Sequence, residues 1–301
     1  MSASTASDAV HPPSFARARH LLGDYFELTK PKVQTLLLLT TVATMEVAGR
    51  PSAARVALTC LGGYLSAGGA AAINHVYDRD IDARMARTAS RPIPSGRVSP
   101  RAGLLFGAAL ATLSFALMAS TLNLLAATLA LAGFAGYVGV YTVWLKRRTP
   151  QNIVIGGAAG AIPPLVGWAA TRGSVAWTAV YLFAIVFYWT PPHFWALSLL
   201  MKGEYAKVGV PMMPVVRGER ETRRHILLYS LLLYAITQLP FCAGEFGALY
   251  LVASMVLGVA FVAGAIRLWW RPDRRAALQL YLFSILYLAL LFGAMVADVK
   301  L

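Results

Sequence analysis

Three polar residues that recur at four-residue intervals follow an apolar segment: Asn74, Asp78 and Asp82 in "AAINHVYDRDID". On an α-helix each such step turns the chain by about 400°, so the side chains drift only ~40° apart and share one face. Stacked carboxylate and amide oxygens suit a hard divalent cation such as Mg²⁺, which also binds water and phosphate oxygens. The spacing therefore predicts a catalytic metal site at these residues, although a charged loop whose acids offset its arginines is the simpler alternative.

The arginines that follow the triplet predict recognition of an anion. Arg87 and Arg91 lie four residues apart, and the planar guanidinium group binds phosphate or carboxylate through two parallel hydrogen bonds. Asp80 falls on another face of the same helix, where we expect it to pair with Arg79 or Arg84. We therefore predict that Arg87 and Arg91 bind substrate.

A second basic cluster, "LKRRTP", lies in a later loop and contains Lys146, Arg147 and Arg148. Lys146 and Arg147 are candidates for neutralising phosphate charge at the metal site. Basic side chains at a membrane surface also anchor helices without any further function, which is the expectation for Arg148.

An ionisable residue lies deep in another apolar segment, "FYWTPPHFWALSLL". Pro191 and Pro192 should disturb a helix here, because proline removes a backbone donor. His193 at such a depth is a candidate functional residue, although a neutral imidazole bonded to a neighbouring helix is the alternative. Aromatic residues around it, including Trp195, could pack or could face a cation with their rings.

The elements that carry these residues are apolar runs, in a chain that is 58% hydrophobic and 13% charged. Runs of about twenty residues are long enough to cross ~30 Å of hydrocarbon. Only helices and closed barrels leave no backbone group unpaired in lipid, and the runs are too long for barrel strands, so helices follow. We predict an all-α polytopic membrane protein with nine transmembrane helices in one bundle. The expected spans are 33–48, 54–73, 102–120, 122–144, 153–170, 177–201, 226–243, 247–266 and 276–296.

The charges predict the orientation of the bundle. With nine spans, 23 of the 27 Lys and Arg residues fall on the side of the N-terminus, which the positive-inside rule assigns to the cytoplasm. The C-terminus is then outside. Topology and anionic headgroups account for the net charge of +14, so we expect no nucleic-acid partner. Residues 1–25 are polar and without a signal-peptide pattern, and we expect a disordered cytoplasmic tail before a single domain over 26–301.

The motifs together resemble the UbiA-type intramembrane prenyltransferases. The superfamily feature is the Asn74–Asp78–Asp82 triplet after a second span. Further segments resemble the branch that farnesylates haem: "ELTKPKV", "SRPIPSGRVSP", "LKRRTPQNIVIGGAAGAIPPLVGW", "PPHFWALSL" and "GVPMMPVV". The similarity extends from near Glu27 to the ninth span.

The resemblance implies a helix bundle with a central cavity in a bacterial inner membrane, and farnesyl diphosphate and haem B as substrates. The product would be haem O, on the route to haem A for terminal oxidases, with a haem A synthase as partner. Mg²⁺ would be the cofactor. We expect His193 to orient haem through its iron, beside Trp195, and Arg91 to pair with a propionate.

One departure from the family pattern leaves alternatives open. Many superfamily members carry a second acidic motif after the sixth span, where this chain offers only Glu204 before Glu219. The second metal site is then incomplete, or Glu204 completes it with water and diphosphate. A prenyltransferase that acts on a quinone or another aromatic acceptor is the first alternative. A membrane transporter, to which the Pro163–Pro164 and Pro191–Pro192 pairs give some support, is the second.

Overall fold

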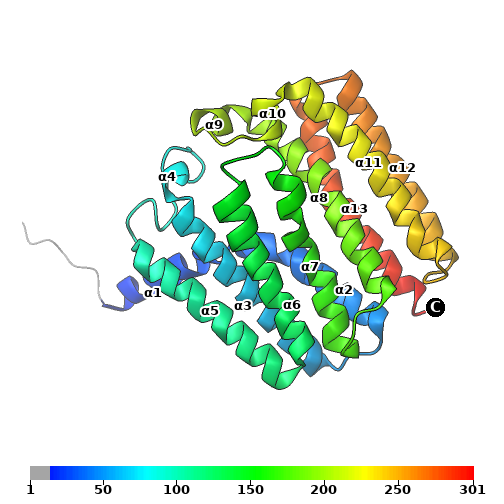
Figure 1. Ribbon diagram of the computed structural model, residues 1–301, viewed down its shortest axis with the longest axis horizontal. Helices are drawn as coiled ribbons and strands as arrows, with labels where there is room; N and C mark the ends of the chain where they lie inside the picture. The colour runs from blue at the N-terminus through cyan, green and yellow to red at the C-terminus, as the bar shows by residue number, and fades with distance from the viewer. Residues whose placement is uncertain (1–13) are drawn as a thin grey trace, which may run out of the picture.

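The computed structural model describes residues 14–301, and all regular structure in this part of the chain is helical (Figure 1). The helices are α1 (Ser14–Leu28), α2 (Pro31–Ala48), α3 (Ala53–Tyr77), α4 (Arg79–Asp82), α5 (Pro100–Thr121), α6 (Leu124–Ala135), η1 (Gly136–Leu145), α7 (Asn152–Arg172), α8 (Trp177–Leu200), α9 (Lys202–Lys207), α10 (Met213–Val216), α11 (Gly218–Cys242), α12 (Ala248–Trp270) and α13 (Arg274–Asp298).

Within residues 14–301, seven segments are long and apolar enough to cross a membrane: α3, α5, α6 with η1, α7, α11, α12 and α13. They confirm the predicted multi-pass helical architecture. Helices α2 and α8, of 18 and 24 residues, pack against α7 in the same bundle and coincide with the two remaining expected spans. That these two also cross the membrane, giving nine spans, stays a prediction.

Several helices begin where the sequence supplies a cap. The side chains of Ser52, Ser99, Asn123 and Asp273 each accept a hydrogen bond from the backbone N–H three residues further on, at 2.7 to 3.2 Å. Such caps satisfy one of the four N–H groups that have no partner inside a helix. These local signals explain why the apolar runs start as helices at these residues.

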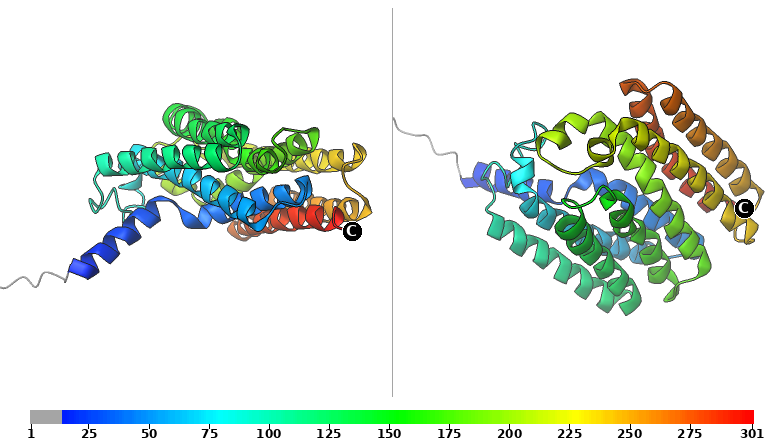
Figure 2. Two further views of the ribbon diagram at one scale, coloured as in Figure 1. Left: turned by 90° about the horizontal axis from the view of Figure 1, so that it is seen from below. Right: turned by 45° about the horizontal axis from the view of Figure 1, so that its top comes forward.

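Helix α1 differs from the expectation for the N-terminus. It covers residues 14–25 of the segment for which a disordered tail is predicted, and it projects away from the bundle (Figure 2). The remainder of that segment lies outside the described residues. Helix α1 contains Leu21, Leu22 and Phe26, which are exposed. Apolar side chains on one short helix at the edge of a bundle are typical of a helix that lies in the membrane interface.

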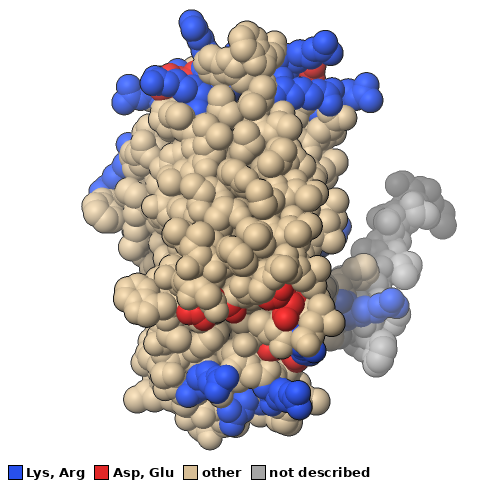
Figure 3. Space-filling model, turned by 90° about the vertical axis from the view of Figure 1, so that its right-hand side faces the viewer, with Lys and Arg blue, Asp and Glu red and all other residues tan. Residues whose placement is uncertain are grey.

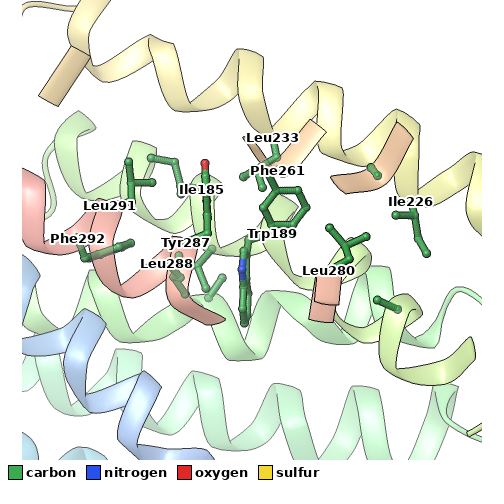
Figure 4. Packing of buried hydrophobic residues seen from close by; sticks show 14 of the residues in the cluster. Ile185, Trp189, Ile226, Leu233, Phe261, Leu280, Tyr287, Leu288, Leu291 and Phe292 are labelled. Carbon is green, nitrogen blue, oxygen red and sulfur yellow. The ribbon is translucent and has the colours of Figure 1, made fainter. Parts of the chain in front are cut away.

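The largest part of the core joins α8, α11, α12 and α13. Trp189 of α8 and Tyr287 of α13 pack in one cluster with Phe261 of α12 and Leu233 of α11 (Figure 4). The Trp189 Nε1–H donates to the backbone oxygen of Ser284 at 2.7 Å, so the indole is both packed and hydrogen-bonded. These contacts hold α8 against α11, α12 and α13.

Close packing of α3 against α5 depends on glycine. A methyl group added to Gly69 would lie 2.6 Å from the backbone oxygen of Gly107, and one added to Gly107 would lie 2.6 Å from Ile73. Small residues at such contacts let two helix backbones approach each other in a membrane. The contact holds α3, which carries Asn74 and leads directly into Asp78, against α5.

Charged and uncharged side chains occupy different parts of the surface of the bundle. Figure 3 shows Lys and Arg gathered toward the two ends of the bundle, with a broad band of uncharged residues between them. Exposed apolar side chains such as Val252, Val256 and Val259 of α12 would face lipid. The protein is a multi-pass membrane protein.

Candidate active site

The triplet lies at the junction between α3 and α4. Helical hydrogen bonds continue through it, from Asp78 N to Asn74 O at 2.9 Å and from Asp82 N to Asp78 O at 2.7 Å, so the four-residue spacing keeps its phase. All three residues are at least 95% buried. The Asn74 amide donates to Asp78 Oδ2 at 2.8 Å. Two of the predicted ligands, Asn74 and Asp78, are thus in direct contact, and the third, Asp82, lies one helical turn further along the chain.

Each of the three side chains contacts a basic residue from elsewhere in the chain. Lys146 Nζ donates to Asp78 Oδ2, and Arg91 Nη1 donates to Asp82 Oδ2 at 2.6 Å. Lys30 Nζ donates to Asn74 Oδ1 at 2.6 Å. A site with two carboxylates among three cations carries both signs of charge, so it suits a ligand that also carries both, such as a metal diphosphate.

Lys146 directly follows a π-helix. Helix η1 continues α6 over Gly136–Leu145, and Lys146 N bonds to Tyr141 O, five residues back, at 2.9 Å. Thr142 of η1 accepts a hydrogen bond from the Asn74 amide at 3.1 Å. π-helical turns are rare and occur frequently at functional sites. Here the wider turn places Thr142 and Lys146 together on the face toward α3.

Asp80 faces away from the triplet, as predicted, but its partner is different. Arg147 binds both carboxylate oxygens of Asp80 at 2.6 and 2.8 Å and also donates to Tyr77 O at 2.7 Å. The expected pairing with Arg79 or Arg84 was wrong, because the loop after η1 brings Arg147 closer. The hydrogen bonds from Arg147 lower the pKa of Asp80 to about 2. Arg147 therefore anchors α4 to η1.

Two other predicted substrate residues lie on the loop after α4 and on α9. Arg87 is exposed and makes no hydrogen bond or ion pair within residues 14–301. Glu204 accepts a hydrogen bond from Ala86 N at 3.2 Å and from Lys207 at 3.0 Å. The contact with Lys207 lowers the pKa of Glu204. Glu204 thus holds α9 beside the loop that carries Arg87.

His193 is packed between aromatic rings on α8. Its ring stacks on Trp189 at 4.3 Å and on Tyr281 at 4.9 Å, and Nδ1 lies 2.7 Å from the hydroxyl of Ser284. Helix α8 runs without interruption through the two prolines, so the expected disturbance is not seen. Contacts with α7, α11 and α13 hold the helix where two backbone donors are missing.

Trp195 lies on α8 in the core, fully buried against His225 and Tyr229 of α11. These contacts are those of a packing residue. Its predicted part in substrate binding stays a prediction.

Two residues at the site were missed by the sequence analysis. Lys30 has left-handed backbone angles, φ 52° and ψ 56°, directly before Pro31, and such strain in a non-glycine residue often marks a functional position. Burial, together with the charges of Arg91 and Lys146, lowers the pKa of Lys30 to about 7. Its only sequence signal was the "TKP" that precedes the first apolar run.

His75, the second missed residue, follows Asn74 on α3. It is 1% exposed, and neither ring nitrogen has a hydrogen-bond partner among the described residues. A buried imidazole without a partner is costly, so a bound ligand would stabilise it.

The site fits a divalent cation. The Oδ1 atom of Asp78 is buried and has no hydrogen-bond partner in the described part of the chain, so one carboxylate oxygen is left for a ligand. Residues 14–301 contain no cluster of three His, Cys, Asp or Glu side chains arranged for a metal. A cation here would therefore depend on Asp78, Asp82 and Asn74 with water or phosphate oxygens, which is the pattern that Mg²⁺ prefers.

The sequence model of the UbiA prenyltransferase family matches residues 36–291. A protein named protoheme IX farnesyltransferase from Chloroflexus aurantiacus is 54% identical over 282 residues, 93% of this chain and 48% of the relative. A relative of the same name from Thermus thermophilus is 55% identical over 91% of this chain and 46% of its own length. The chain spans about half the length of these curated relatives, but 94% of a Gloeobacter violaceus relative of the same name, which is 50% identical over 95% of this chain.

Solved structures share the fold. A digeranylgeranylglyceryl phosphate synthase superposes with a TM-score of 0.77 at 20% identity, over 94% of this chain and all of that one. A UbiA homolog from Archaeoglobus fulgidus, bound to DMAPP and Mg²⁺, gives a TM-score of 0.66 at 17% identity, over 90% of this chain and 99% of its own. With the family match over most of the helical bundle, these results establish that the chain belongs to the UbiA prenyltransferase family.

Proposed function

We propose that the protein transfers the farnesyl group of farnesyl diphosphate to a vinyl group of haem B, giving haem O and diphosphate. The observation that carries this proposal is the pairing of Asp78 and Asp82 with Lys146 and Arg91, with Asp78 Oδ1 left without a partner in the described residues. The relatives named protoheme IX farnesyltransferase support the choice of substrates.

At the diphosphate, Asn74, Asp78 and Asp82 would hold Mg²⁺. The bound cation would neutralise charge on the diphosphate as the leaving group departs. Lys146 bonds to Asp78 and Lys30 bonds to Asn74, so both ammonium groups lie beside the ligand residues and would bind phosphate oxygens of the diphosphate. Arg87, exposed on the neighbouring loop, would bind the far end of the diphosphate, and Arg147 fixes α4 in place.

During the reaction the farnesyl C–O bond breaks, and its electron pair leaves with the diphosphate. The electron pair of the haem vinyl group forms the new C–C bond, and water supplies the hydroxyl of the product and loses a proton. Tyr137 and Tyr141, with ring centres 5.3 Å apart, lie on η1, which directly precedes Lys146. Their rings would stabilise the allylic cation, which apolar surroundings protect from water.

On the acceptor side, we assign His193 to the haem. Its Nδ1 is bonded to Ser284, which leaves Nε2 for the iron, and the stacked rings of Trp189 and Tyr281 fix the imidazole plane. Because Arg91 bonds to Asp82, we assign it to the diphosphate and no longer to a propionate group of haem. Trp195 would support α8 beneath His193, and Glu204 would position the loop with Arg87.

The same proposal places the protein in a bacterial inner membrane, with the N-terminus in the cytoplasm and a haem A synthase as the consumer of its product. The excess of Lys and Arg at the end of the bundle that carries the triplet supports this orientation.

Purified protein supplied with farnesyl diphosphate labelled in the farnesyl group, haem B and Mg²⁺ tests the function. We expect the label in a porphyrin product of greater mass and lower polarity. Label in an added quinone precursor but not in porphyrin would assign the protein to another branch of the family. No transfer to either acceptor, by protein that still binds the diphosphate, would contradict the proposal.

A further inference from the structure

A basic pocket lies at the end of the bundle opposite the triplet. The chain turns there between α2 and α3 and between α7 and α8, and a hollow of about 460 Å³ is lined by Arg50, Arg55 and Arg172 with Ser52 and Thr171. Helix α3 connects the two ends, since it starts at Ala53 beside the pocket and ends at Tyr77 beside Asp78. Its 25 residues span ~37 Å at 1.5 Å per residue.

These arginines are unusual for their position. This end of the bundle holds four of the 27 Lys and Arg residues in the chain, and three of the four line the one pocket. The fourth, Lys300, is bonded to Glu46 at 2.6 Å. None of the three arginines forms an ion pair with any residue from 14 to 301. The pocket thus concentrates the positive charge of this end, and that charge is not neutralised by the described protein groups.

Two of the guanidinium groups are held in place by backbone oxygens. Arg172 Nε donates to Ala48 O at the end of α2, and Arg55 Nη1 donates to Thr171 O at 3.2 Å and to Ala170 O at 3.4 Å at the end of α7. These bonds satisfy carbonyl groups that the helix ends leave free. Each guanidinium keeps N–H groups without a described partner, and Arg50 makes no hydrogen bond in the described structure through its side chain.

We propose that the basic pocket binds the phosphate group of an anionic phospholipid, such as phosphatidylglycerol. Guanidinium groups bind phosphate oxygens through parallel, charge-assisted hydrogen bonds. Basic pockets between transmembrane helices bind anionic lipid headgroups on the cytoplasmic side of membranes, and the same chemistry is available to this pocket at the opposite end. The pocket is lined by residues at the ends of α2, α3 and α7, and α3 and α7 are long and apolar enough to cross a membrane, so we expect it to lie at the depth of a headgroup. A haem propionate of the reacting substrate is excluded, because the macrocycle is much shorter than α3, which separates the pocket from the carboxylates.

Lipid binding to purified protein in detergent, followed by native mass spectrometry, tests this proposal. We expect phosphatidylglycerol to bind at least ten-fold more tightly than phosphatidylcholine, and the variants Arg50→Gln and Arg172→Gln to lose that preference. Arg50→Gln is the cleaner variant, because Arg50 does not cap a helix. Arg148→Gln, an exposed arginine at the other end, is the matched control and should bind lipid like the parent protein.

Competition with inorganic phosphate distinguishes the phosphate group of a lipid from free phosphate as the ligand. If millimolar phosphate displaces the lipid, a free anion is also a ligand of the same pocket; if it does not, the acyl chains contribute and the lipid is the specific ligand. Equal binding of phosphatidylglycerol by Arg50→Gln, Arg172→Gln and the parent protein would overturn the proposal. Farnesyl transfer in detergent should be unchanged in Arg50→Gln, so the outcome does not depend on the proposed enzymatic function.

Discussion

Lys146, which directly follows η1, donates a hydrogen bond to the buried carboxylate of Asp78, 68 residues earlier in the chain. The same carboxylate oxygen accepts from Asn74, while the other oxygen has no described partner. A buried ion pair of this kind costs desolvation free energy and is rarely retained for stability alone. We interpret it as the resting form of a site in which a cation takes the carboxylate and the lysine binds the phosphate.

Replacement of Lys146 tests whether this lysine binds the phosphate. We expect Lys146→Met to weaken the binding of farnesyl diphosphate ~10-fold or more, because a hydrogen bond between charged groups is lost. Haem binding, measured by absorbance, should be unchanged. Lys146→Arg should restore part of the affinity, and Arg148→Met, two residues away and exposed, should have no effect. Unchanged affinity in Lys146→Met would remove this residue from the site.

The role of His193 can be separated from its packing by comparison with Ser284. Both His193→Ala and Ser284→Ala break the hydrogen bond at Nδ1, which should lower the free energy of unfolding by ~1–3 kcal/mol. Only His193→Ala removes the imidazole, so only this variant should change the haem absorbance spectrum and retain the binding of farnesyl diphosphate. Identical spectra in the two variants would make His193 a core residue.

The orientation is tested by reporters fused to the two ends of the chain. An odd number of spans puts Arg17 and Lys300 on opposite sides of the membrane, so a fluorescent reporter that matures only in the cytoplasm should give signal at the N-terminus alone. Signal at both ends would mean an even number of spans. Helices α2 and α8 are the two expected spans that are not among the seven long, apolar helices, so repeating the fusions with α2 deleted shows which of the two fails to cross.

The apolar runs predicted the helices well, because hydrophobic length alone determines what can cross a bilayer. The structure begins and ends α7 and α13 within two residues of the expected limits. The triplet was also predictable, because its phase depends on local helical hydrogen bonds across the junction of α3 and α4 and involves no distant contact. The sequence gives no comparable signal for η1, since a π-helix has no pattern of its own.

The contacts between distant segments were not predictable. Lys30 and Thr142 meet Asn74 only because α2, α3 and η1 pack together. Lys146 was predicted at the site, but no pattern in the sequence pairs it with Asp78 in particular. Asp80 has arginines nearby in the sequence, yet pairs with Arg147, 67 residues away. Local spacing identifies which side chains share a helix face, but the partner across the interface depends on tertiary packing.

The central claim, that Asp78 and its triplet hold a cation at the diphosphate, is tested most directly by Asp78→Asn against Asp80→Asn. Both variants remove one negative charge, but Asp78 is buried in the site and Asp80 is paired outside it. We predict that Asp78→Asn, at normal levels in the membrane and with normal haem binding, lowers Mg²⁺-dependent farnesyl transfer at least ~100-fold. A chelator should have the same effect on the parent protein, and Asp80→Asn should keep activity within a few-fold. Full activity in Asp78→Asn, or equal losses in the two variants, would contradict the claim.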